Sequence, residues 1–408
     1  MAKRTLSGDQ GDLRQGNLAA ILNHLRQNES LTRTTLAQLT GLNRATITRL
    51  VRELIDSGFV YENGLQASTT GRPAIPLNLN PDAGYIIGAE IGFDSITAIV
   101  TDFSPTIVWR QQVEVDLQES LEDIVERACS ILEAARDYAR QHSPRLFGLG
   151  LGLPGLVDTH SGTLLFAPNL HWTDVPIRQI LENRLNIPVF VDNVASASAL
   201  GESYLGAAQD YNNVLYLSTQ GGLGGRFVIN GNILRGAGGF AGEVGHMTVR
   251  DTGRRCNCGR IGCWETLASQ VSVLQRVRER IEAGDSSLLK DMISGDLAKI
   301  TIPLIVDAAY SGDSVATAAL RDTGHWLGVG LANLINAFNP DLVVIGGMLS
   351  LAHDFLLPEI AAVIAKEPLR WLRESCKIVI AEHKADAVLM GGVATVYREV
   401  IENPQKWI

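Results

Sequence analysis

The 408-residue sequence lacks long apolar runs and is poor in cysteine and aromatic residues. No apolar run approaches the roughly 20 residues that span a bilayer, and the polar N-terminus has no apolar secretory stretch. We therefore expect a cytoplasmic protein with no membrane segment, in which clustered cysteines more often bind metal than form disulfides. With 46% apolar and 19% charged residues, the composition excludes global disorder, and the length predicts about two to four domains.

The net charge of -9 argues against a protein that binds nucleic acid over its whole surface, but the charge is distributed unevenly. Residues 1–75 carry nine Lys/Arg and six Asp/Glu, whereas the other 333 residues carry 26 and 38. A mildly basic N-terminal head therefore precedes an acidic body.

The basic head contains three consecutive helical patterns, at residues 17–27, 32–41 and 43–60. Asn43 can cap the third helix, which has a basic, Thr-rich exposed face and a buried stripe formed by Ile47, Leu50, Val51, Leu54 and Ile55. Two short helices joined by the segment LTGLN, of which the second is basic and rich in threonine, predict a helix-turn-helix. The alternative interpretation is a small helical bundle used for dimerisation.

A hairpin wing is predicted after these helices, at residues 59–81, from weak alternation around the Asn-Gly turn at 63–64. Arg72 would lie near its tip, where a cation suits a phosphate or a narrow minor groove. The start of the third helix supplies the other candidates for base-edge or phosphate contacts, namely Arg44, Thr46, Thr48 and Arg49.

From Gly84 onward, apolar strands alternate with helices, which predicts an α/β body in two lobes with a cleft. Strands are expected within 85–103, 146–158, 187–206, 212–234 and 341–349. Helices are expected at 119–141, 269–283, 301–310, 314–337 and 384–402. The strand-turn-strand texture near 85 recurs near 212 and suggests two related lobes. The glycine-bearing turns could handle phosphate, although tight turns use glycine for its conformational freedom alone.

Three of the five cysteines form a C-x-C-x4-C pattern, Cys256, Cys258 and Cys263. His246 would complete a Cys3His set, the closed tetrahedral arrangement of a structural zinc site; His160 and His171 are alternatives for the fourth ligand. We expect Arg254 and Arg255 to offset the thiolate charge, and Gly259 and Gly262 to allow tight turns.

The sequence resembles the ROK family (repressor, open reading frame, kinase), through GFAGEVGHMTV at 239–249 and CNCGRIGCWET at 256–266. Supporting stretches are LGLPGLVD at 151–158, LFAPNLHW at 165–172 and NAFNPDLVVIGG at 336–347. With the head included, the resemblance extends from about residue 15 to the end and is strongest to the branch of xylose and N-acetylglucosamine repressors. It implies an actin-like, hexokinase-like body that binds a sugar through Asn193, Glu243, His246 and Glu265.

Within this frame the predicted domains are a winged helix-turn-helix at 1–80, a first α/β lobe at 81–200 completed by 384–408, and a second lobe at 201–383. The second lobe would carry the zinc loop and a dimerisation surface.

In this sequence, residues that the family's kinases use to bind phosphate and to catalyse transfer are replaced. Phe93 replaces a glycine of the first phosphate loop, Arg226 replaces the last glycine of the second, and Val194 stands where the kinases have their catalytic Asp. Valine cannot accept a proton from a sugar hydroxyl, and Asp192 would point to the opposite side of its strand. The sequence therefore predicts a protein with no catalytic residue, not an enzyme.

The predicted function is a sugar-responsive regulator, most simply a repressor, that binds a palindromic operator as a homodimer or tetramer. Its effector would be xylose or a glucose-like sugar bound in the inter-lobe cleft. Two alternatives stay open: a sugar kinase with a regulatory head, and a repressor controlled by a protein partner. An exposed apolar patch near the zinc loop, around Ile261 and Trp264, would favour the second.

Overall fold

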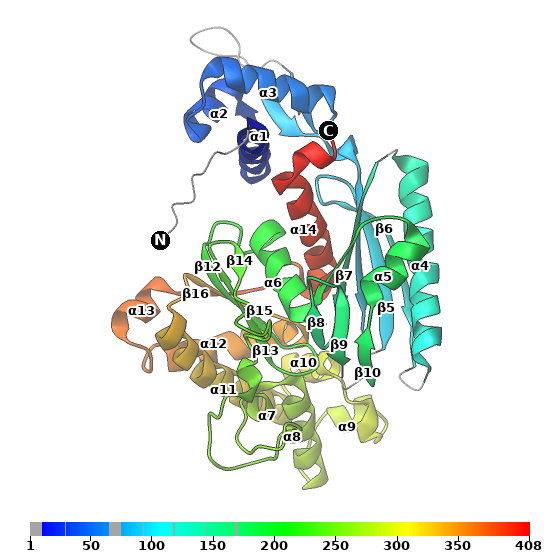
Figure 1. Ribbon diagram of the computed structural model, residues 1–408. Helices are drawn as coiled ribbons and strands as arrows, with labels where there is room; N and C mark the ends of the chain where they lie inside the picture. The colour runs from blue at the N-terminus through cyan, green and yellow to red at the C-terminus, as the bar shows by residue number, and fades with distance from the viewer. Residues whose placement is uncertain are drawn as a thin grey trace, which may run out of the picture. The chain divides into compact units, whose positions relative to one another are not determined.

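The computed structural model describes residues 10–28, 30–64, 75–92, 94–116, 119–143, 145–167 and 170–408 (Figure 1). The chain forms two compact units: unit 1 comprises Met1–Asn193 with Gly392–Ile408, and unit 2 comprises Val194–Gly391. The three-part division predicted from the sequence stays a prediction. Among the described residues, none of the helices has the length and apolar character that a membrane span requires.

The head of unit 1 has the predicted winged helix-turn-helix fold. Its helices are α1 (Gln10–Gln27), α2 (Arg33–Thr40) and α3 (Arg44–Asp56), and its strands β1 (Leu31–Thr32), β2 (Val60–Glu62) and β3 (Pro76–Leu79) form an antiparallel sheet in the order β1-β3-β2. The Thr32 and Asn43 side chains cap α2 and α3 by accepting from the Thr35 and Thr46 amides, which satisfies backbone donors that a helix start leaves free. The sheet favours the wing over a purely helical dimerisation bundle.

The main sheet of unit 1 has five strands in the order β11-β7-β4-β5-β6. The strands are β4 (Tyr85–Ile91), β5 (Ser95–Thr101), β6 (Ile107–Glu114), β7 (Leu146–Leu153) and β11 (Val189–Asn193). Helices α4 (Leu121–His142) and α5 (Ile177–Leu185) pack against it, and β8 (Leu156–Asp158), β9 (Thr163–Ala167) and β10 (Trp172–Val175) form a small separate sheet.

Unit 2 contains a sheet of the same design, in the order β14-β13-β12-β15-β16. Its strands are β12 (Asn213–Ser218), β13 (Gly224–Ile229), β14 (Asn232–Ile233), β15 (Leu342–Gly346) and β16 (Lys377–Ile380). In both sheets three antiparallel strands are followed by two parallel ones. The two sheets confirm that the strand-turn-strand patterns near residues 85 and 212 belong to two related lobes.

The helices of unit 2 form the larger part of its core. They are α6 (Val194–Leu205), α7 (Glu265–Ala268), α8 (Gln270–Glu282), α9 (Leu289–Met292), α10 (Ile302–Tyr310), α11 (Ser314–Phe338), α12 (His353–Ile364) and α13 (Arg370–Ser375). The last long helix, α14 (Ala387–Glu402), begins in unit 2 and ends in unit 1. Buried side chains of α8, α10, α11 and α12 pack against β12 and β15 and support the long loop that precedes α7.

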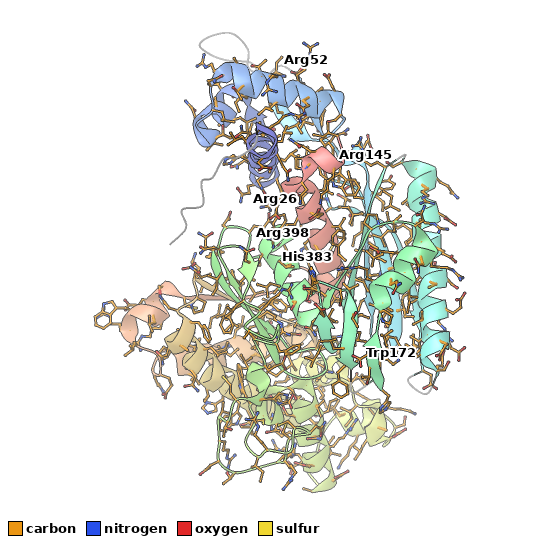
Figure 2. The ribbon with its side chains drawn as sticks, in the orientation of Figure 1. Arg26, Arg52, Arg145, Trp172, His383 and Arg398 are labelled. Atoms are coloured by element: carbon orange, nitrogen blue, oxygen red, sulfur yellow. The ribbon has the colours of Figure 1, made fainter. Side chains whose placement is uncertain are left out.

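An aromatic cluster joins the head to the rest of unit 1. Phe59 is fully buried, and its ring centroid lies 5.4 Å from that of Phe103 and 5.8 Å from that of Phe147. The ring of Tyr397, on α14, lies 4.9 Å from Phe103. The Arg145 guanidinium, labelled in Figure 2, lies 5.0 Å from the Phe59 ring and donates to the carbonyls of Ser57 and Ala83. The head is thus packed into unit 1 by buried rings and not tethered by a bare linker.

Candidate functional site

The exposed face of α3 is the candidate DNA-reading surface. Ile47, Leu50, Val51 and Leu54 are fully buried, so the amphipathic pattern fixes which face remains outside. Arg44, Thr48 and Arg49 are exposed and Thr46 is half-buried, while Arg52 projects from the same helix (Figure 2). The Thr48 hydroxyl donates to the Arg44 carbonyl at 2.8 Å, which fixes its position on the face. Arg72, at the predicted wing tip, lies outside the described residues.

The four residues predicted as metal ligands come together in unit 2. The ligand atoms of His246, Cys256, Cys258 and Cys263 all lie within 4.8 Å of one another. His246 Nδ1 is 3.6 Å from Cys256 Sγ, and Cys258 Sγ is 3.5 Å from Cys263 Sγ. These residues could therefore hold one metal ion between them. His160 and His171, the alternative ligands, belong to unit 1 and are not members of this cluster.

Two glycines allow the loop to present its cysteines. Gly259 and Gly262 have φ of +89° and +82°, in the region that strongly favours glycine. A Cβ at Gly262 would lie 1.6 Å from the Arg250 carbonyl oxygen. The loop closes on itself through hydrogen bonds from the Val249 amide to the Gly262 carbonyl and from the Cys256 amide to the Arg260 carbonyl.

Trp264 anchors this loop in the core of unit 2 and does not form the surface patch that a protein partner would need. Its side chain is fully buried, and its indole N–H donates to the Trp326 carbonyl on α11 at 2.6 Å. Gly330 lies so close that a Cβ there would be 2.0 Å from the indole. Ile261 is 45% exposed, so of the two expected patch residues one is on the surface and the other is in the core.

The charges around the thiols differ from those expected. Arg254 pairs with Glu279 and donates to Gln275 Oε1 at 2.6 Å. Instead, hydrogen bonds from the Arg260 backbone and side chain lower the pKa of the Cys258 thiol to about 6. Burial, followed by the hydrogen bond to Glu265, raises the pKa of Cys256. The two thiols therefore differ in acidity, because their surroundings lower the pKa of Cys258 and raise the pKa of Cys256.

Three of the four predicted sugar-binding residues lie at this loop. Glu243 precedes the short 3-10 turn Val244–His246, and its carbonyl accepts from the His246 amide at 3.2 Å. Glu265, the first residue of α7, has its Oε1 3.4 Å from His246 Nδ1 and 2.8 Å from Cys256 Sγ. The Glu265 carboxylate and the His246 imidazole thus lie side by side, and Glu243 stands three residues before His246. Carboxylates and an imidazole can accept hydrogen bonds from the hydroxyl groups of a polyol.

Asn193, the fourth predicted residue, is the last residue of β11 and ends the first of the two chain segments that make up unit 1. Its side-chain amide donates to the Gly155 carbonyl at 2.7 Å, and its backbone amide donates to Asp192 Oδ1 at 2.8 Å. Its part in sugar binding stays a prediction.

Arg226 is a site residue whose role the sequence did not reveal. The sequence alone indicates only that Arg226 replaces a phosphate-loop glycine. In the structure, its buried guanidinium lies 3.5 Å from Glu243 Oε1. The available signal was a single charged residue in an otherwise apolar and glycine-rich segment, 221–229.

The head is a winged DNA-binding domain. It is followed by an actin-like, hexokinase-like body, which contains the two matching sheets and the loop with the potential metal ligands. Residues 17–61 match the winged helix-turn-helix DNA-binding family, and residues 86–399 match the ROK family. The chain belongs to the ROK family.

Two regulators match nearly the whole chain, and a kinase matches part of it. The chain is 34% identical over 393 residues to the xylose repressor of Caldicellulosiruptor bescii, covering 96% of this chain and 98% of the relative. The crystal structure of a ROK transcriptional regulator, a homologue of the E. coli MLC protein, superposes with a TM-score of 0.81 at 30% identity, covering 96% and 97% of the two chains. A ROK glucokinase from Streptomyces griseus, in complex with glucose and AMPPNP, gives 0.68 at 32% identity, covering 78% of this chain and 100% of its own.

Proposed function

We propose that this protein is a sugar-responsive transcriptional repressor. It binds operator DNA through its winged head and a monosaccharide effector through unit 2. The proposal is supported by the cluster of Glu265 and His246 with the nearby Glu243, which we assign to sugar binding, and by Val194, which we align with the kinases' catalytic Asp. A chain that holds a sugar but has no base to activate it can report the sugar's presence.

DNA binding is assigned to α3, with Arg44, Thr46, Thr48 and Arg49 reaching base edges or neighbouring phosphates, and Arg72 contacting DNA from the wing. The positive face of α3 suits the anionic backbone, and the exposed Thr48 and half-buried Thr46 can contact bases in the major groove. A two-fold symmetric operator would be bound by a homodimer, alone or within a tetramer.

The metal is assigned as zinc, held by His246, Cys256, Cys258 and Cys263. A zinc tetrahedron with the usual bond lengths has edges of about 3.5–3.8 Å, close to the sulfur–sulfur and sulfur–nitrogen separations of 3.5 and 3.6 Å. Four protein ligands complete the coordination shell, so the ion's chemistry is structural: it orders the loop. With Nδ1 of His246 facing the thiols, Nε2 remains available to a sugar hydroxyl.

The effector is assigned as xylose or a related sugar without an exocyclic hydroxymethyl group. Support comes from Val194, whose apolar side chain suits the space in which the kinases meet the 6-hydroxyl. Glucose, held by the other polar residues, is the rival. Calorimetric titration with both sugars separates them: tight binding of glucose without binding of xylose would exclude the pentose assignment.

The kinase alternative requires catalysis without the Asp and with altered phosphate loops. It is supported by the glucokinase's similarity to the body, but Val194 opposes it. The partner-controlled alternative is weakened by the burial of Trp264. Incubation of the purified protein with ATP and either sugar tests the former, since any phosphorylated sugar would contradict the sensor proposal.

The decisive experiment is a gel-shift with the DNA upstream of the protein's own gene, with and without D-xylose or D-glucose. We expect a shifted complex whose amount changes with one sugar, because a ligand alters DNA affinity only if it binds two conformations unequally. The R49A variant should lose most of the complex, and R140A, which removes an exposed arginine of α4, should retain it. A complex that neither sugar affects would contradict the proposal.

A further inference from the structure

We propose that Arg226 is a positioning residue of the sugar site, holding the Glu243 carboxylate in the orientation that accepts the effector's hydroxyls. The inference rests on the proposed function and deepens it. Arg226 is the third residue of β13, and its side chain is 92% removed from solvent. A buried guanidinium is costly unless its donors are satisfied, so its partners indicate what it does.

Each nitrogen of the Arg226 guanidinium is directed at a different segment of unit 2. Nε donates to Ser196 Oγ, in the first turn of α6, at 2.9 Å. Nη1 donates to the Gly225 carbonyl on its own strand at 2.8 Å. Nη2 lies 3.5 Å from Glu243 Oε1. One planar group therefore connects the helix that begins at Val194, the strand β13 and the loop that carries Glu243.

The Glu243 loop is pressed against Arg226 by its backbone as well. The Gly225 amide donates to the Gly242 carbonyl at 3.0 Å. A Cβ at Gly242 would lie 2.0 Å from the Gly225 carbonyl oxygen and 2.7 Å from Arg226 Nη1. Gly242 also has a φ of +104°, so glycine is required here both for its conformation and for its lack of a side chain.

Glu243 needs this support because its side chain is 51% exposed. A glutamate with a solvated carboxylate samples several rotamers, and ordering it upon sugar binding costs affinity. Arg226 reduces that cost beforehand by attracting the carboxylate to one side. The same substitution that removed a phosphate-loop glycine therefore supplies a support for the sugar site.

The test is a set of calorimetric titrations of the zinc-loaded full-length protein with D-xylose and D-glucose. R226M should weaken sugar binding by about three- to tenfold, the factor expected for ordering one free side chain. R226K keeps the charge and should restore part of the loss. R278M is the matched control. Arg278, on α8, is half-buried and donates to the Leu297 carbonyl, so its replacement should leave the Kd unchanged.

A double-mutant cycle with E243Q decides between positioning and a general structural role. If Arg226 acts through Glu243, R226M should cause little further weakening in the E243Q background. Full additivity, or wild-type Kd in R226M, would overturn the inference. If E243Q binds too weakly to titrate, R226K and R226M decide: equal losses in both would overturn it.

The same variants separate this inference from the proposed function. Wild-type sugar affinity in E243Q would overturn the assignment of Glu243 to the sugar site. Loss of binding in E243Q together with additive effects of R226M would leave that assignment intact and overturn the role of Arg226. Thermal unfolding of each variant, compared with R278M, identifies any that fails to fold, and R226K then carries the test.

Discussion

Replacing Phe59 by alanine tests whether the head and the first sheet are one cooperative structure. The Phe59 side chain is fully buried between the rings of Phe103 and Phe147 and beneath the Arg145 guanidinium. Removing a phenyl ring from such a core typically costs about 3–5 kcal/mol, because rigid neighbours leave a cavity. For a cooperative unit of about two hundred residues, each kcal/mol lowers the unfolding midpoint by about 2–4 °C. We therefore expect the unit 1 midpoint of F59A to fall by roughly 10 °C.

The assay is differential scanning calorimetry, combined with hydrogen exchange of the α3 and β4 amides. Tyr61, two residues further along and 39% exposed, provides the matched control: Y61A should change stability by less than about 0.5 kcal/mol. In F59A, amides of α3 and β4 should become less protected together. Faster exchange in α3 alone, with an unchanged midpoint for the sheet, would show that the head unfolds separately and would refute the reasoning.

Three further predictions follow from other parts of the molecule. C263S should reduce bound zinc to near zero, measured by elemental analysis, and should weaken sugar binding, since the ordered loop carries the carboxylates; full zinc occupancy would contradict the ligand assignment. R49A should lower DNA affinity and, if the contact is to phosphate, reduce the slope of log affinity against log salt by about 0.9, measured by fluorescence anisotropy. Burial disfavours the ionised Asp313 carboxylate, but its hydrogen bonds from Ala316, Ser287 and Leu288 outweigh this and lower its pKa from the ordinary 3.8. D313A should therefore cost about 1–2 kcal/mol at pH 7. The stability difference between wild type and D313A should be fully present above the ordinary pKa of 3.8. It should shrink as the pH falls through the lowered pKa of Asp313 in the folded protein. A stability difference that stays constant down to about pH 2 would contradict this prediction.

Local signals in the sequence predicted the elements whose structure is decided locally. Thr32 and Asn43 were recognisable as caps, and the stripe of α3 defined its buried face. These features depend on neighbours three or four residues away along one helix. The spacing of the cysteines indicated the metal cluster in the same way, because its thiols lie within one short loop.

Elements that depend on distant partners were missed. Strand β6 has mostly exposed side chains and exists because it pairs with β5 at the edge of the sheet, so no apolar alternation marked it. Helix α12 contains Pro358, a residue that normally argues against a helix interior, and it is stabilised by packing on α11 in the core. Similarly, the polar loop around Trp264 does not indicate whether this side chain is exposed, and packing on Gly330 of α11 buries it.

The sequence by itself determined the helix-turn-helix, the alternation of strands and helices and the Cys3His set. Each of these follows from residue type and short-range spacing. The tertiary structure decided that the Arg226 guanidinium lies beside Glu243, that Arg260 and not Arg254 contacts a thiol, and that Phe59 joins the head to the sheet. The contact between the Phe59 and Phe147 rings and the hydrogen bond from the Arg145 side chain to the Ser57 carbonyl each join residues 88 positions apart. Side chains so far apart in sequence meet only through the folding of the whole unit, and no local pattern encodes which of them will be neighbours.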